Sequence, residues 1–104
     1  MINDTYQIVM KTMMGKKYGQ LTLYENERCL SGNFNILGHN HEINNGVLVD
    51  GKCRFSGKLM TPVRNIDYMA EGSVDEHSVE LVIHTDRYKM SLFGKNENTK
   101  RGER

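Results

Sequence analysis

The stretch Val47-Leu48-Val49-Asp50-Gly51-Lys52-Cys53-Arg54-Phe55 decides the fold class of this chain. Apolar and polar side chains alternate after Asp50-Gly51, and a period of two is typical of a half-buried β-strand. Asp-Gly favours the positive φ angles that a two-residue hairpin turn requires. The stretch therefore predicts an antiparallel β-hairpin, with Cys53 and Phe55 on one face of its second strand.

Similar turn signals recur along the chain at nearly even spacing. Asn26-Glu27, Asp50-Gly51 and Asp75-Glu76 lie 24 and 25 residues apart. A second set lies between and around them, at Thr12 to Gly15, Leu37 to Asn40, Thr61-Pro62 and Thr85-Asp86. Together the turns leave segments of strand length, about eight in number, which is enough to close a small antiparallel barrel. The expected strands cover residues 6–11, 18–24, 30–36, 47–49, 52–59, 66–72, 79–83 and 88–92.

An internal repeat supports this architecture. Leu30-Ser31-Gly32-Asn33-Phe34 aligns with Phe55-Ser56-Gly57-Lys58-Leu59 at an offset of 25 residues. Each unit comprises two strands and their connections, and such units bury a core only when they are stacked. Glycines on the expected inward face, Gly32, Gly57 and Gly72, suit the tight coiling of a small barrel. The sequence therefore predicts an all-β fold, an eight-stranded antiparallel up-and-down meander β-barrel with little or no helix.

Composition bounds the domain count and the class of partner. A length of 104 residues fits one domain. We expect a barrel over residues 1–94 and a disordered polar tail over residues 95–104, where no apolar side chain occurs. A net charge of +1 argues against a nucleic-acid partner. No signal-peptide pattern and no apolar run of about 18 residues is present, so we expect a cytoplasmic protein without a membrane partner.

The residues that could carry chemistry are few. Two cysteines, Cys29 and Cys53, allow one disulfide, but without a secretion signal reduced thiols are the favoured reading. His39 and His41 lie two residues apart and would chelate zinc or copper if they shared a strand face with a third ligand, for which Glu42 is the nearest candidate. An exposed polar loop explains the same residues more simply. No nucleophile motif or phosphate loop is present, so we assign no catalytic residue, no metal and no cofactor.

Aromatic and methionine side chains gather on the expected inward faces. Buried tyrosine hydroxyls need hydrogen-bond partners, and such a lumen suits a small apolar or aromatic ligand with a polar handle. The alternative is that the same side chains fill the barrel. The candidate ligand-binding residues are Tyr6, Met10, Phe34, Phe55, Tyr68, Tyr88 and Met90. At the barrel mouth, alternation leaves Arg64 rather than Arg54 as a group that could receive a carboxylate.

The chain resembles the avidin- and lipocalin-like (calycin-like) group of up-and-down barrels, and more closely a group of short bacterial domains of unassigned function. The resemblance covers about residues 5–94 and rests on turn chemistry. It is carried by Lys11-Thr12-Met13-Met14-Gly15, Leu30-Ser31-Gly32, Val49-Asp50-Gly51-Lys52, Met60-Thr61-Pro62 and Gly72-Ser73-Val74-Asp75. The chain has no tryptophan, whereas the lipocalin motif and the avidin biotin site both use it. Arg87 and Tyr88 are adjacent, which on a strand places them on opposite faces and departs from the Arg-x-Tyr pair of fatty-acid-binding barrels.

Three functional hypotheses follow. The first is a non-enzymatic barrel that holds a small apolar or aromatic ligand in its lumen. The second is a solid barrel that acts as an interaction module or homodimer, with Val9, Val82 and Phe93 on its outer face. The third is an enzyme or the accessory subunit of one, for which Glu42, His39 and Tyr88 are the first residues to mutate.

Overall fold

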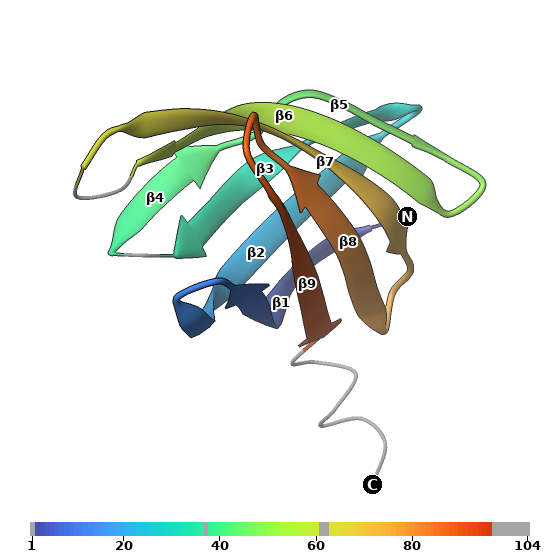
Figure 1. Ribbon diagram of the computed structural model, residues 1–104. Coiled ribbons are helices and arrows are strands. Elements are labelled where there is room, and N and C mark those ends of the chain that lie inside the picture. Colours follow the sequence, from blue (N-terminus) through green and yellow to red (C-terminus); the bar gives the residue numbers. More distant parts are fainter. Residues whose placement is uncertain (1, 37, 61–62, 97–104) are drawn as a thin grey trace, which may run out of the picture.

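The computed structural model describes residues 2–36, 38–60 and 63–96, which form a single antiparallel sheet (Figure 1). Its strands are β1 (Asn3–Thr12), β2 (Gly15–Asn26), β3 (Cys29–Ile36), β4 (His39–Glu42), β5 (Asn44–Val49), β6 (Lys52–Met60), β7 (Asn65–Val74), β8 (Ser78–His84) and β9 (Lys89–Asn96). None of the described residues forms a helix long and apolar enough to cross a membrane.

The sheet closes on itself as an up-and-down barrel. Apart from β4 and β5, strands that follow each other in the chain are paired, and β1 pairs with β9 from Tyr6↔Asn96 to Lys11↔Ser91. β4 and β5 are separated only by Ile43 and both pair with β3, so they form one bent strand. The predicted eight-stranded barrel is therefore confirmed.

The bent strand differs from the expectation in its length. Residues 39–42, expected in a connection and a polar loop, form β4. The alternation that located the strand at 47–49 fails further back because the ladder with β6 shifts register between Asn44 and Val47, where Asn45 has a φ of 54°. A β-bulge of this kind reverses which side chains face inward, so a strict period of two cannot follow the strand through it.

Turn chemistry explains several hairpins. Asp50 and Gly51 have φ angles of 53° and 80° and form the predicted turn between β5 and β6. Between β7 and β8, the Asp75 carboxylate accepts hydrogen bonds from the N–H groups of His77 (2.8 Å) and Ser78 (2.9 Å). A short polar side chain that accepts backbone N–H groups in this way fixes the β7–β8 turn locally.

The connections fall at two opposite ends of the barrel. We call the end with the β2–β3, β5–β6 and β7–β8 connections and the first residues of β1 the acidic end. The end with the β1–β2, β3–β4, β6–β7 and β8–β9 connections is the basic end. In Figure 1 the β5–β6 connection and the start of β1 lie on the right, and the β1–β2 connection lies on the left.

Two inward glycines let neighbouring strands approach closely. A Cβ atom on Gly72 would lie 2.0 Å from the carbonyl oxygen of Glu80, and one on Gly32 would lie 1.9 Å from that of Thr22. No side chain fits at such distances, so both positions require glycine. Gly57 serves differently, because its missing side chain leaves room for the ring of Tyr68 on the facing strand.

The last strand runs further than expected. β9 includes Lys95 and Asn96, which we had expected in the polar tail. The Asn96 side chain is buried, and its Nδ2 donates to the carbonyl oxygen of Glu76 at 2.7 Å. Because its side chain has a hydrogen-bond partner, this polar residue can be buried, and the strand extends to include it. Residues 97–104 lie outside the described part of the chain.

Candidate functional site

The candidate ligand-binding residues face the barrel interior, as expected. Tyr6, Met10, Phe34, Phe55, Tyr68 and Met90 are all buried, and Tyr88 is half-buried against the same core. Tyr6 is 0% exposed and Phe34 is 1% exposed. A lumen large enough for a ligand leaves part of its lining accessible, so we infer that these side chains fill the space by packing against one another.

The two fully enclosed tyrosines differ in how their hydroxyls are satisfied. The Tyr6 hydroxyl donates to the carbonyl oxygen of Asp75 at 2.6 Å. The Tyr68 ring lies edge-on to Phe34 and Phe55, with centroids 6.1 and 6.3 Å away. Its buried hydroxyl has no hydrogen-bond partner among the described residues. Burial raises the pKa of both phenols above the ordinary value, so both stay protonated at neutral pH.

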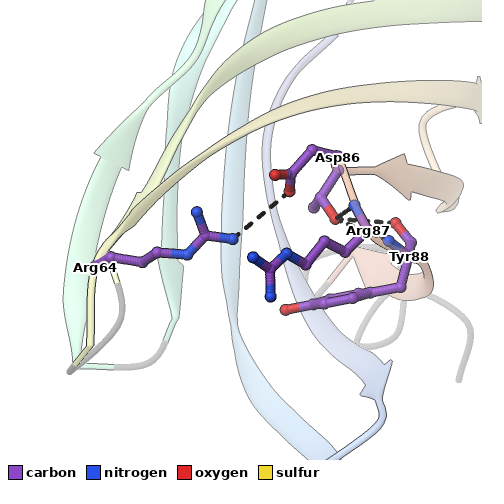
Figure 2. Close-up of polar contacts among 5 residues, drawn as sticks. Arg64, Asp86, Arg87 and Tyr88 are labelled. Atoms are coloured by element: carbon purple, nitrogen blue, oxygen red, sulfur yellow. Dashed lines mark hydrogen bonds and ion pairs between the residues drawn. The ribbon is translucent and has the colours of Figure 1, made fainter.

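Tyr88 lies at the rim of the barrel with two arginines (Figure 2). Arg64 Nη2 approaches Asp86 Oδ1 at 3.7 Å, and the Arg64 and Arg87 guanidinium groups and the Tyr88 hydroxyl lie on the same side of the β8–β9 connection. Tyr88 is half-buried against the core, whereas Arg87 is exposed. Both precede β9, and the alternation rule holds only inside a strand.

The β8–β9 connection is held by one side chain. The Thr85 hydroxyl accepts the N–H groups of Arg87 (3.3 Å) and Tyr88 (3.1 Å) and donates to the Tyr88 carbonyl oxygen (3.1 Å). The rim therefore has a fixed backbone and carries two guanidinium groups beside one carboxylate. Sequence reasoning identified Arg64 but missed Arg87, for which the only available signal was its place in a turn.

The histidine cluster is divided between the core and the surface. His41 is buried, and the Met60 N–H donates to its Nε2 at 3.0 Å. Its Nδ1 must then carry the proton that is shared with the Phe34 carbonyl oxygen at 3.1 Å. Both ring nitrogens of His41 are thus engaged, while His39 and Glu42 are exposed on the same strand. Among the described residues, no three His, Cys, Asp or Glu side chains are arranged to hold a metal ion.

An apolar stripe crosses the outside of three adjacent strands. Val9 on β1 lies directly between Tyr18 on β2 and Phe93 on β9 in the strand register. Tyr18 is 72% exposed and Phe93 is 38% exposed. Lys11 Nζ lies 5.5 Å from the centroid of the Phe93 ring, in a cation–π contact.

This outer stripe, Tyr18–Val9–Phe93, borders a surface hollow. The hollow of about 520 Å³ lies over β1 and β2 and is lined by Gln7, Ile8, Val9, Tyr18, Gly19 and Gln20. The sequence identified Val9 and Phe93 as outward residues. It missed Tyr18, because only the register of β1 with β2 shows that Tyr18 extends the same row.

Comparison with known proteins finds no matching family model, no matching curated protein and no matching solved structure. The likeness to calycin-like barrels therefore rests on architecture alone, and architecture of this kind hosts many unrelated functions.

Proposed function

We propose that this protein is a non-enzymatic interaction module, a solid β-barrel that pairs with a second copy of itself through the outer stripe. The observation that carries the proposal is the contrast between the two sides of the sheet. The interior side chains are buried in one cluster, whereas large apolar side chains stay exposed on the outside. Contiguous exposed apolar surface is characteristic of contact sites.

The stripe is suited to pairing with itself. Val9 is its centre, and Tyr18 and Phe93 flank it on neighbouring strands. A two-fold axis through Val9 and parallel to the strands would set Tyr18 of one copy against Phe93 of the other, twice in the same interface. Aromatic pairs stabilise such contacts beyond the area that they bury. A contact centred on three side chains predicts a weak, concentration-dependent dimer rather than an obligate one.

Sedimentation velocity over a range of concentrations tests the proposal. We expect a reversible monomer–dimer equilibrium whose dissociation constant rises by about tenfold or more in the Tyr18→Ser/Phe93→Ser variant, since each aromatic anchor contributes on the order of 1 kcal/mol or more. The matched control is Val47→Ser/Val49→Ser, which removes apolar side chains of 45% and 47% exposure from β5, outside the stripe. A strict monomer, or equal weakening by both variants, would overturn the proposal.

A ligand in the lumen is the second candidate function, and the Tyr68 hydroxyl is the observation that favours it. A buried hydroxyl without a partner carries a desolvation penalty, which an acceptor on an entering molecule would relieve. Such a ligand must displace packed side chains at the rim, where Tyr88 is half-buried against the core. Melting-temperature screens with small aromatic acceptors test this. We expect stabilisation that is lost in Tyr68→Phe and kept in Tyr88→Phe, and no stabilisation by any compound would reject it.

A further inference from the structure

The β1–β2 connection carries the most exposed pair of adjacent apolar side chains among the described residues. Met13 is 80% exposed and Met14 is 83% exposed. The Thr12 hydroxyl donates to the Gly15 carbonyl oxygen at 2.7 Å and accepts the Met14 N–H at 3.0 Å. The tip is therefore a formed turn that directs two methionines into solvent.

Lysines surround the tip at a cost to the hairpin. Lys11 and Lys16 are direct cross-strand partners, and Lys17 follows them on β2. Like charges placed directly opposite each other destabilise an antiparallel pair. An anionic surface at this position would relieve that repulsion. The hairpin thus combines an apolar tip with a cationic base.

Charge is divided between the two ends of the barrel. The basic end carries the lysines of the hairpin and four further cations, Lys58, Arg64, Arg87 and Lys89, against the carboxylates of Glu42, Asp67 and Asp86. The acidic end carries Asp4, Glu25, Glu27, Asp50, Asp75 and Glu76 against Arg28, Lys52 and Lys95. Val63, which is 89% exposed, adds an apolar side chain to the basic end on the β6–β7 connection. A molecule with this distribution is oriented by an anionic surface, with its basic end foremost.

We propose that the basic end docks on an anionic phospholipid surface, with Met13 and Met14 entering the boundary between headgroups and acyl chains and the three lysines contacting phosphates. A protruding tip buries little surface against a folded protein, whereas a bilayer surrounds it on every side. Aliphatic stems let lysines keep their charge at the headgroups while the tip enters. The electrostatic attraction between the lysines and an anionic membrane adds to the apolar contact that the two methionines make. From the sequence we expect no membrane partner, but that expectation rests on the lack of an apolar run long enough to span a bilayer, and surface docking needs no such run.

Co-sedimentation of the full chain with vesicles tests the proposal. We expect binding to phosphatidylcholine vesicles that contain phosphatidylglycerol, and at least tenfold weaker binding to pure phosphatidylcholine vesicles. Met13→Ser/Met14→Ser and Lys11→Gln/Lys16→Gln/Lys17→Gln should each lower binding about tenfold. The matched control, Arg28→Gln/Lys52→Gln/Lys95→Gln, removes the same charge from the acidic end and should bind like the wild type.

Methionine oxidation gives a second readout that does not depend on variants. Peroxide oxidises exposed methionines, so mass spectrometry should show Met13 and Met14 oxidised in buffer and several-fold protected by the anionic vesicles. The half-buried Met69, on the outer face of β7, should be oxidised at the same rate in both conditions. The proposal is overturned if the charge variants of the basic end and of the acidic end bind the vesicles equally well. It is also overturned if the vesicles do not protect Met13 and Met14 from oxidation. A third result would overturn it in favour of an acidic protein partner: the chain binds polyglutamate as tightly as it binds the vesicles, and Met13→Ser/Met14→Ser does not weaken the binding to polyglutamate.

Discussion

The two ends of the barrel are built differently. At the acidic end, residues distant in the chain are joined by hydrogen bonds: Ile2 N–H donates to Glu25 Oε1 at 3.0 Å, and the Tyr6 hydroxyl and the Asn96 amide donate to carbonyl groups of the β7–β8 connection. At the basic end, the Thr12 and Thr85 hydroxyls satisfy the β1–β2 and β8–β9 connections from within. Met13, Met14 and Val63 are exposed there, and the contact between Arg64 and Asp86 spans 3.7 Å. The difference teaches that the acidic end is tied together by hydrogen bonds between distant residues, while the basic end presents its apolar side chains to solvent.

Among the described residues, each end has one buried polar side chain, and replacing either one gives the largest expected effects. His41→Leu should lower the free energy of unfolding by about 3 kcal/mol, because it leaves the Met60 N–H and the Phe34 carbonyl group without this partner. Asn96→Leu should cost about 2 kcal/mol through the lost bond to Glu76. Urea unfolding measures both values. If His41→Leu lowered the free energy of unfolding by less than Asn96→Leu does, the core at the basic end would also be weakly held, and not only its connections.

The two buried tyrosines test the same contrast with a single atom. Tyr6→Phe should lower the free energy of unfolding by about 1 to 2 kcal/mol, since the Asp75 carbonyl group loses its donor. Tyr68→Phe removes a hydroxyl that has no partner, so the variant should be as stable as the wild type or up to about 1 kcal/mol more stable. Parallel thermal melts compare them. Equal losses in both variants would show that the Tyr68 hydroxyl is satisfied in solution.

The architecture could be predicted from the sequence, but most of the contrast between the two ends could not. Turn residues such as Asp50-Gly51 and the alternation of Phe55 with its neighbours act locally, so they predicted the barrel and the inward set. The partner of Tyr6 lies 69 residues away, and no local pattern reports it. Likewise, the bulge near Asn45 interrupts the alternation, so residues 39–42 were interpreted as a polar loop and the burial of His41 was not predicted. Site residues at the rim, such as Arg87, could not be placed because a turn follows no period.

Acid should weaken the acidic end at one turn. Hydrogen bonds from the backbone N–H groups of His77 and then Ser78 hold the pKa of Asp75 below its usual range. A carboxyl group with a lowered pKa stabilises the fold above the ordinary pKa, and this contribution is lost as the pH falls through the lowered pKa. Asp75→Asn should therefore be less stable than the wild type at neutral pH, by less than about 1 kcal/mol because the group is exposed. Unfolding curves should converge for the two proteins in strong acid, and a constant gap would assign the effect to the side chain's shape rather than its charge.

The cysteines report the tightness of the acidic end without altering it. Cys29 and Cys53 both follow turns at this end and are free thiols, the first exposed and the second buried. Burial raises the pKa of Cys53 to about 11, so the native protein holds little of the reactive thiolate at neutral pH. Iodoacetamide should label Cys29 rapidly and Cys53 only when the β5–β6 hairpin opens, while Cys29→Ser should leave the melting temperature unchanged. Labelling of Cys53 in Cys29→Ser then measures the opening of this end. The Tyr6 hydroxyl bonds to the β7–β8 connection at the same end, so adding Tyr6→Phe should speed the labelling of Cys53, whereas adding Tyr68→Phe should not. If both substitutions accelerated labelling equally, the barrel would open as one unit and its two ends would not differ.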